Sequence, residues 1–162
     1  MSRAAHPCEV LADACYIGAN IRPIHSAKES AKVSAKIGLW GPTTNVFQSW
    51  HALASVLGIK IHHFCGSEFH SESGNVAFNS NPTETVDILI TDGWPNGFND
   101  PAWSLTREHL ARLGEPKLLP TPPFSIGREL GFDPIGYDGF VGYEQKRVLL
   151  SVQRAILMHA LG

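Results

Sequence analysis

The sequence has little cysteine and no long apolar run. Its three cysteines, Cys8, Cys15 and Cys65, are an odd number and form no Cys-x-x-Cys pair. We therefore expect no disulfide framework and a cytoplasmic protein. Uninterrupted apolar segments stay well below the ~18 residues that a membrane-spanning helix requires. The residues before His6 carry no signal-peptide pattern.

A charge excess of one sign is also lacking. The chain has 13 Lys and Arg against 15 Asp and Glu, a net charge of −2, with no basic stripe. This balance gives no electrostatic basis for binding nucleic acid or an anionic membrane surface. Histidine is plentiful, but His62 and His63 would alternate to opposite faces of a strand, and their spacing to Cys65 matches no standard zinc pattern. We expect no metal ion or other cofactor.

What is present is the composition of one globular α/β domain. The chain has 162 residues, of which 43% are hydrophobic, enough for one sizeable core. Predicted strands and helices alternate, which favours a three-layer, doubly wound parallel sheet of Rossmann-like type. The predicted strands are 36–40, 59–64, 86–91 and 117–119, with a short edge strand near Val76 and a last strand at 139–143. The predicted helices are one from Pro7, then 46–57, 106–113 and about 144–161, and segment 22–35 reads as polar and irregular.

Three loops follow predicted strands and are rich in polar residues, glycine and proline. They comprise residues 43–45, 92–97 and 120–128. The carboxyl ends of parallel strands lie at one edge of the sheet, and ligands of doubly wound sheets bind at that edge. The sequence therefore predicts the binding site there.

A motif at His6 opens the first helix. Proline suits the first helical position, and the carboxylate of Glu9 suits the positive end of the helix dipole, so a plain helix start explains the His-Pro pair. The longer run from His6 to Asp13, His-Pro-Cys-Glu-Val-Leu-Ala-Asp, resembles the His-Pro-x-Gln segment of the aspartate and ornithine transcarbamylases, especially the ornithine branch. The resemblance implies that His6 and Glu9 occupy the positions that contact the carbamoyl group of carbamoyl phosphate.

Two further segments are similar to the same family. Residues 88–94, Ile-Leu-Ile-Thr-Asp-Gly-Trp, resemble its Thr-Asp-x-Trp segment and imply that Asp92, beside Trp94, holds the ammonium of an amino-acid substrate. A carboxylate can make such a charge-assisted bond, although an Asp after a strand often only caps a turn. Residues 41–46, Gly-Pro-Thr-Thr-Asn-Val, resemble the family's Gly-Asp-x-Asn-Asn-Val. Asn45 would then bind the substrate carboxylate, a role that can coexist with capping the helix.

The chain departs from the family pattern in three places. Glu9 replaces the glutamine. Pro95-Asn96-Gly97 replaces the Ser-Met-Gly loop and is one residue shorter, which leaves Asn96 as the substrate-binding candidate of that loop. Leu118-Leu119-Pro120-Thr121 keeps only the Leu-Pro of His-Cys-Leu-Pro-Arg, so Pro120 remains a candidate while the cysteine and the arginine have no match.

The resemblance covers residues 1–162 as a single domain, the amino-acid-binding half of a transcarbamylase. No segment matches the Ser-x-Arg-Thr loop of the family's other half, which binds carbamoyl phosphate. The terminal helix is apolar around most of its circumference, which requires burial on several sides. Its apolar residues are Val148, Leu149, Leu150, Val152, Ala155, Ile156, Leu157, Met158, Ala160 and Leu161. We expect the N- and C-terminal helices to pack on a separate carbamoyl-phosphate-domain-like subunit, in a heteromer that the resemblance implies to be threefold.

The sequence leaves an enzymatic and a non-catalytic interpretation open. An enzyme subunit would complete its active site with the partner and act on an amino-acid-type small molecule. Glu9 in place of the glutamine and the losses of the cysteine and the arginine all affect the carbamoyl phosphate side, where two like unit charges 4 Å apart repel by about 4 kcal/mol at an effective dielectric constant of about 20. This favours hydrolysis of an amide-linked amino-acid conjugate, with Glu9 as general base and His6 polarising the carbonyl. Genuine carbamoyl transfer to an amino acid and a non-catalytic scaffold subunit are the alternatives.

Overall fold

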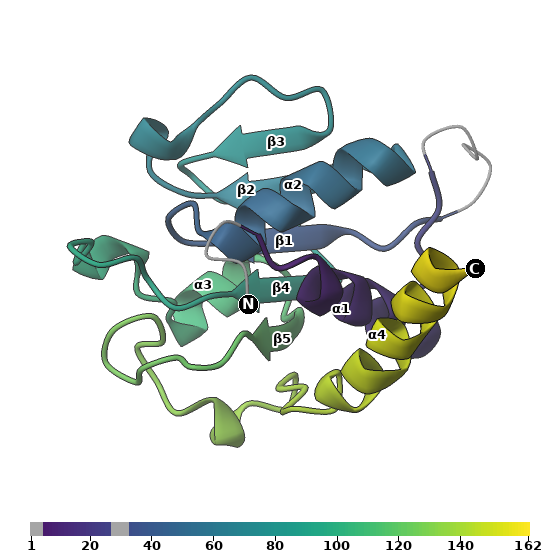
Figure 1. Cartoon of the computed structure of the whole chain (residues 1–162). Coiled ribbons are helices and arrows are strands. Elements are labelled where there is room, and N and C mark those ends of the chain that lie inside the picture. Colours follow the sequence, from purple (N-terminus) through teal and green to yellow (C-terminus); the bar gives the residue numbers. More distant parts are fainter. Residues whose placement is uncertain (1–4, 27–32) are drawn as a thin grey trace.

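The computed structural model describes residues 5–26 and 33–162. In this part of the chain, five parallel strands form one sheet in the spatial order β3-β2-β1-β4-β5 (Figure 1). The strands are β1 (Ile37–Trp40), β2 (Ile61–Phe64), β3 (Val76–Asn79), β4 (Ile88–Thr91) and β5 (Lys117–Pro120). The α-helices are α1 (Pro7–Asn20), α2 (Asn45–Leu57), α3 (Arg107–Arg112) and α4 (Lys146–Leu161), with single 3-10 turns at Ser67–Phe69, Pro101–Trp103 and Pro134–Gly136. The predicted doubly wound α/β fold is confirmed.

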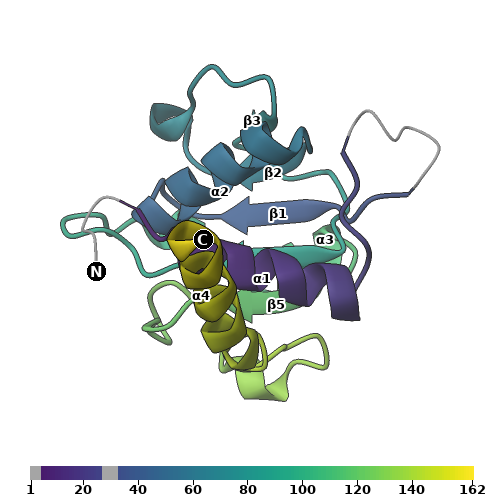
Figure 2. The ribbon, with the colours of Figure 1, turned by 45° about the vertical axis from the view of Figure 1, so that its right-hand side comes forward.

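The helices form layers on both faces of the sheet. Helix α1 packs beside α2 over one face, and α4 packs on α1. Figure 2 shows α4 crossing α1 on the side away from the sheet. The opposite face is covered by α3 and by irregular chain around it, whose buried residues include Leu105, Leu110 and Leu130. Each face thus has its own apolar cluster, with Phe47, Trp50 and Ile17 fully buried on the α1–α2 side.

Local chemistry explains where the first two helices begin and end. Pro7 is the first residue of α1, and His6 occupies its N-cap, as the His-Pro pair predicts. Helix α2 is capped by Thr44, whose hydroxyl accepts the Phe47 amide at 3.2 Å, so the predicted capping role of Asn45 is wrong. Gly58 closes α2 in the left-handed conformation, with φ 64°.

Three other predictions need comment. Residues 139–143 form no strand: the chain turns there, and Leu118 makes only a single bridge, with Phe140. The structure assigns Pro120 to β5, where the chain tolerates proline because β5 is an edge strand. Residues 27–32 of the predicted irregular segment lie outside the described part of the chain.

The sheet order creates a switch point between β1 and β4. From β1 the chain proceeds outward to β2 and β3, whereas β4 and β5 lie on the other side of β1. The loops after β1 and β4 therefore diverge at the carboxyl edge of the sheet, where doubly wound folds bind ligands. Thr44 belongs to the first of these loops and Asp92 to the second.

Candidate functional site

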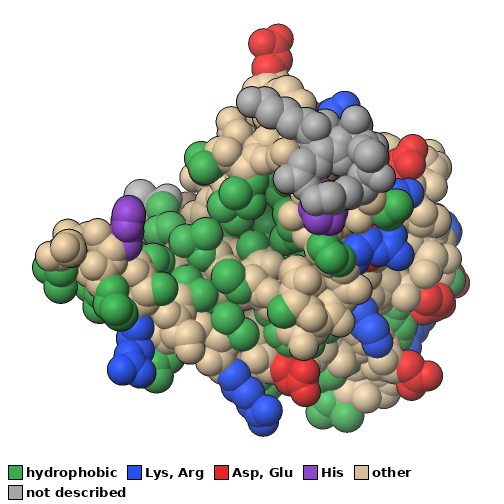
Figure 3. All heavy atoms as spheres, turned by 90° about the vertical axis from the view of Figure 1, so that its right-hand side faces the viewer, with side chains coloured by type: hydrophobic (Ala, Val, Ile, Leu, Met, Phe, Trp, Pro, Cys, Tyr) green, Lys and Arg blue, Asp and Glu red, His purple; other side chains and the backbone are tan. Residues whose placement is uncertain are grey.

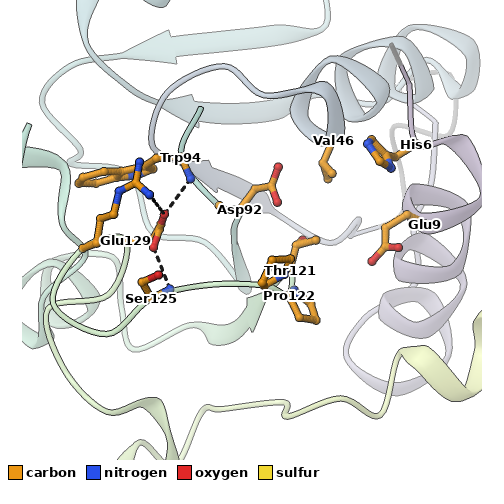
Figure 4. A pocket seen from close by; sticks show the side chains of 12 residues that line it. His6, Glu9, Val46, Asp92, Trp94, Thr121, Pro122, Ser125 and Glu129 are labelled. Atoms are coloured by element: carbon orange, nitrogen blue, oxygen red, sulfur yellow. Dashed lines mark hydrogen bonds and ion pairs between the residues drawn. The ribbon is translucent and has the colours of Figure 1, made fainter. Parts of the chain in front are cut away.

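A cavity of about 600 Å³ opens at this switch point (Figure 4). Its walls come from the start of α1, the start of α2, the loop after β4 and the loop after β5. The lining residues are His6, Glu9, Val46, Asp92, Gly93, Trp94, Thr121, Pro122, Pro123, Ser125, Arg128 and Glu129. Four of the sequence-predicted site residues, from segments more than 80 positions apart, are thus brought to one cavity: His6, Glu9, Asp92 and Trp94.

The first turn of α1 supplies one wall. The His6 amide donates to the Ser49 hydroxyl at 2.9 Å, which fixes the start of α1 against α2. Glu9 lies in the first turn of α1 and points into the cavity (Figure 4). Its carboxylate accepts a hydrogen bond from the Lys146 ammonium of α4 and forms an ion pair with it. Burial lowers the pKa of Lys146. Glu9 therefore carries its own counter-ion.

Asp92 faces this wall from the end of β4. Burial raises the pKa of its carboxyl group, while hydrogen bonds from the Thr44 hydroxyl and the Gly93 amide, together with nearby His6, oppose that rise. Within the described residues, Asp92 has no lysine or arginine partner. A half-buried carboxylate that points into a cavity without such a partner is suited to bind a ligand cation.

Glu129 is the buried carboxylate that holds the cavity's far wall together. Its side chain is only 3% exposed. One oxygen accepts the Trp94 amide at 2.9 Å, and the other accepts the Ser125 amide at 2.8 Å, so the loops after β4 and β5 are tied to one carboxylate. Arg128 adds a cation, with Nη1 3.7 Å from the carboxylate. Sequence reasoning missed Glu129, because a single acid in the irregular segment 124–132 has no periodicity to mark it.

Trp94 is 7% exposed and forms the apolar part of the same wall. Phe98 packs edge-on against its ring with centroids 5.0 Å apart, and the Arg128 guanidinium lies 5.6 Å from the ring centroid. Gly41 lies beside this ring, and its φ of 114° is a backbone conformation that favours glycine. Trp94 is thus held by contacts on several sides.

The other three predicted site residues do not line the cavity. Asn45 is exposed at the first position of α2, next to the lining residue Val46. Asn96 is exposed in the loop after β4, and Pro120 is buried as the last residue of β5. Substrate contacts by these three residues stay predictions.

The described residues offer no ready metal centre or membrane helix. No three of their His, Cys, Asp and Glu side chains gather closely enough to hold an ion. His62 and His63 do point to opposite faces: His63 is buried beside His51, whereas His62 stacks on Phe64. None of the helices that the structure describes combines the length and the apolar character needed to cross a bilayer.

The sheet order and the cavity at its switch point define a doubly wound α/β domain with a binding site at the carboxyl edge of its strands. No protein-family model and no curated protein matches the sequence. Solved structures do match. Ornithine carbamoyltransferase from Thermus thermophilus superposes with a TM-score of 0.81 at 20% identity over 99% of this chain, and the enzyme from Burkholderia thailandensis with 0.79 at 19% identity over 97%.

A third structure, an N-acetyl-L-ornithine transcarbamylase variant in complex with carbamyl phosphate and N-succinyl-L-norvaline, matches with a TM-score of 0.72 at 13% identity over 95% of this chain. The chain spans 57%, 55% and 56% of the length of these three proteins. It therefore has the fold of about half of an ornithine carbamoyltransferase chain, which confirms the resemblance at the level of the fold.

Proposed function

We propose that this chain is the amino-acid-binding subunit of an ornithine carbamoyltransferase-like enzyme whose carbamoyl-phosphate-type half is a separate protein. The observation that carries the proposal is Asp92, a carboxylate without a lysine or arginine partner among the described residues, pointing into a cavity at the sheet's switch point. Such a group binds the ammonium of an amino acid by a charge-assisted hydrogen bond. The other two cavity carboxylates, Glu9 and Glu129, already have cationic partners.

The surface of α4 supports a missing partner. None of its residues is buried, and beyond Gln153 the helix is exposed all round. Leu157 is 59% exposed, Met158 76% and Leu161 86%. Figure 3 shows hydrophobic side chains gathered on this side of the molecule. A contiguous apolar surface of this kind is typical of an interaction site.

A groove beside the cavity extends this apolar surface. It lies between α1 and α2 and is lined largely by apolar side chains, including Pro7, Leu11 and Leu53. A second groove joins the start of α1 to Leu149 and Gln153 of α4. A partner that covers both would also close the mouth beside His6 and Glu9. We propose that this chain and its partner form a threefold heteromer in the cytoplasm, the arrangement that the resemblance to the transcarbamylases implies.

For the chemistry, we propose hydrolysis of an amide-linked amino-acid conjugate. Glu9 would act as the general base toward water and His6 would polarise the carbonyl, because both face the cavity opposite Asp92. Carbamoyl transfer is a second candidate, favoured by one observation: Lys146 compensates the charge of Glu9, which weakens its repulsion of an anionic phosphate ligand.

The test combines the chain with a carbamoyl-phosphate-domain homologue and assays two sets of substrates. One arm contains carbamoyl phosphate with L-ornithine, and the other contains amino acids acylated on the side-chain nitrogen, which keep a free α-ammonium for Asp92. Hydrolysis predicts that Glu9→Gln loses about 10²–10⁴ in rate while it still binds substrate. Glu72→Gln, at an exposed position in the loop before β3, is the matched control.

If the Glu9→Gln variant is as active with carbamoyl phosphate as the wild type, or more active, the reaction is carbamoyl transfer and the hydrolysis proposal is wrong. A stable complex that turns over neither set of substrates would favour the non-catalytic scaffold role. Failure of the two proteins to associate would contradict the proposed partnership itself.

A further inference from the structure

Arg128 is a cation on the cavity wall that the proposed function does not use. Among the described residues that line the cavity, it is the only lysine or arginine. Its side chain is 39% exposed, so a ligand in the cavity can reach the guanidinium. The cavity therefore has a positive group in addition to the carboxylate of Asp92, the proposed ammonium site.

Most of the hydrogen-bonding capacity of Arg128 is unused. A guanidinium has five N–H donors. Among the described residues, the acceptor that it reaches is the Phe98 carbonyl, 3.2 Å from Nη2. The carboxylate of Glu129 is near enough for an ion pair, but its separation of 3.7 Å from Nη1 exceeds hydrogen-bond distance. Both oxygens of Glu129 already accept backbone amides, at 2.9 and 2.8 Å. Arg128 therefore keeps N–H groups to which a ligand anion can bind.

The contacts that Arg128 does make hold its guanidinium in place. The Phe98 carbonyl accepts a hydrogen bond from one nitrogen, and the guanidinium carbon lies 5.6 Å from the centroid of the Trp94 ring. Trp94 is itself 7% exposed and packs edge-on against Phe98, with ring centroids 5.0 Å apart. A planar group held in this way loses little conformational freedom when it binds a carboxylate.

Arg128 and Asp92 carry opposite charges, yet no ion pair joins them within the described part of the chain. They nevertheless belong to one region of the cavity. Trp94 follows Asp92 by two positions, and its amide donates to Glu129, the chain neighbour of Arg128. Two separate charges of opposite sign in one cavity are complementary to a ligand that carries both.

We propose that Arg128 binds the carboxylate of the ligand whose ammonium binds Asp92, so that the cavity selects an amino acid over a diamine. The inference rests on the proposed function, because it takes an ammonium as the group bound at Asp92. It departs from the family resemblance, which implies that Asn45 binds the carboxylate, although Asn45 does not line the cavity. Arginine suits the role because its planar fork matches the two oxygens of a carboxylate.

This assignment also orients the ligand. In Figure 4, Trp94 lies on one side of Asp92. His6 and Glu9 lie on the other side. Arg128 belongs to the side of Trp94, because its guanidinium lies near that ring. An amino acid bound by both charges would therefore extend its side chain toward His6 and Glu9, the two residues proposed for the chemistry.

The test compares L-ornithine with 1,4-diaminobutane, which is L-ornithine without its carboxylate, by calorimetry on the full chain with its partner present. The wild type should bind L-ornithine about ten- to hundredfold more tightly, the range for a charge-assisted hydrogen bond. In Arg128→Gln this preference should fall to about threefold or less, whereas Arg128→Lys, which keeps the charge without the fork, should retain part of it. Because the preference is a ratio within each variant, a general loosening of the cavity cancels.

Arg112→Gln, at an exposed position on α3, is the matched control and should keep the wild-type preference. A wild type that binds both ligands equally overturns this inference and leaves ammonium recognition by Asp92 standing. A preference that Arg128→Gln leaves unchanged also overturns it, and its loss in Asn45→Ala would then assign the carboxylate to Asn45. If the wild type binds neither ligand, the proposed function is wrong as well.

Discussion

Lys146 and Glu9 form an ion pair that joins the two terminal helices at the rim of the cavity. The residues are 137 positions apart, and both side chains are mostly buried. The pair gives Glu9 a counter-ion and fixes where α4 begins relative to α1. It therefore links the candidate catalytic wall to the helix that we expect to meet the partner.

A double-mutant cycle of Glu9→Gln and Lys146→Met should give a coupling energy of about 1 kcal/mol in urea unfolding, since both groups are partly buried. The control is Glu108→Gln with Arg112→Met, an exposed pair on α3 whose charged atoms are 4.0 Å apart. We expect about 0.3 kcal/mol there. Equal couplings in the two cycles would show that the α1–α4 pair adds nothing beyond surface charge.

Asp13→Asn should change the pH dependence of stability. Burial raises the pKa of Asp13 from its ordinary value of 3.8 to about 7 in the fold, so the native state binds more protons and its stability falls as pH rises between these values. One pKa unit is worth about 1.4 kcal/mol, so the penalty approaches about 4 kcal/mol above pH 7. Asparagine removes this penalty.

Asp13→Asn should therefore be more stable than the wild type at pH 8 and similar to it at pH 4. The measurement is chemical denaturation at both pH values, with Asp138→Asn, at an exposed position, as the control. A constant difference at the two pH values would show that Asp13 is not protonated in the fold.

Glu129→Ala should destabilise the fold by about 3 kcal/mol, because the buried Trp94 amide and the Ser125 amide lose their acceptor and Arg128 loses its ion-pair partner. The emission of Trp94 should shift to the red as the loop after β4 loosens. Glu72→Ala is the control, and denaturation with tryptophan fluorescence is the measurement. A small effect, within 0.5 kcal/mol or so of the control, would mean that water replaces Glu129.

Without its partner, the chain should self-associate through α4. Sedimentation velocity should detect oligomers for the wild type, and Leu157→Glu with Leu161→Glu should abolish them by placing charges on the apolar surface. Ile135→Glu, which substitutes a 79% exposed residue near α3, should leave association unchanged. A wild-type chain that sediments as a monomer at high concentration would count strongly against the expected interface.

The features of the fold and the site that the sequence predicts are those marked by residues close together in the chain. Pro7 marks the start of a helix, and alternating strands and helices fix the sheet edge from which Asp92 emerges, because these signals lie within a few residues. The Lys146–Glu9 pair and the two loops tied by Glu129 depend on contacts between distant segments, which no local pattern encodes. Thr44, and not Asn45, caps α2 because the chain turns one residue earlier, within the usual uncertainty of a helix boundary. Asp13 lies in the opening motif, but its burial becomes evident only in the folded chain.

Binding of L-ornithine to the assembled complex tests the central claim most directly, because that claim assigns substrate ammonium recognition to Asp92. Calorimetry should show that Asp92→Asn loses ten- to hundredfold in affinity, the value of about 1.5–3 kcal/mol for a charge-assisted bond. Asp138→Asn should bind as the wild type does, and both variants should remain folded. An Asp92→Asn complex that binds L-ornithine with unchanged affinity would contradict the account.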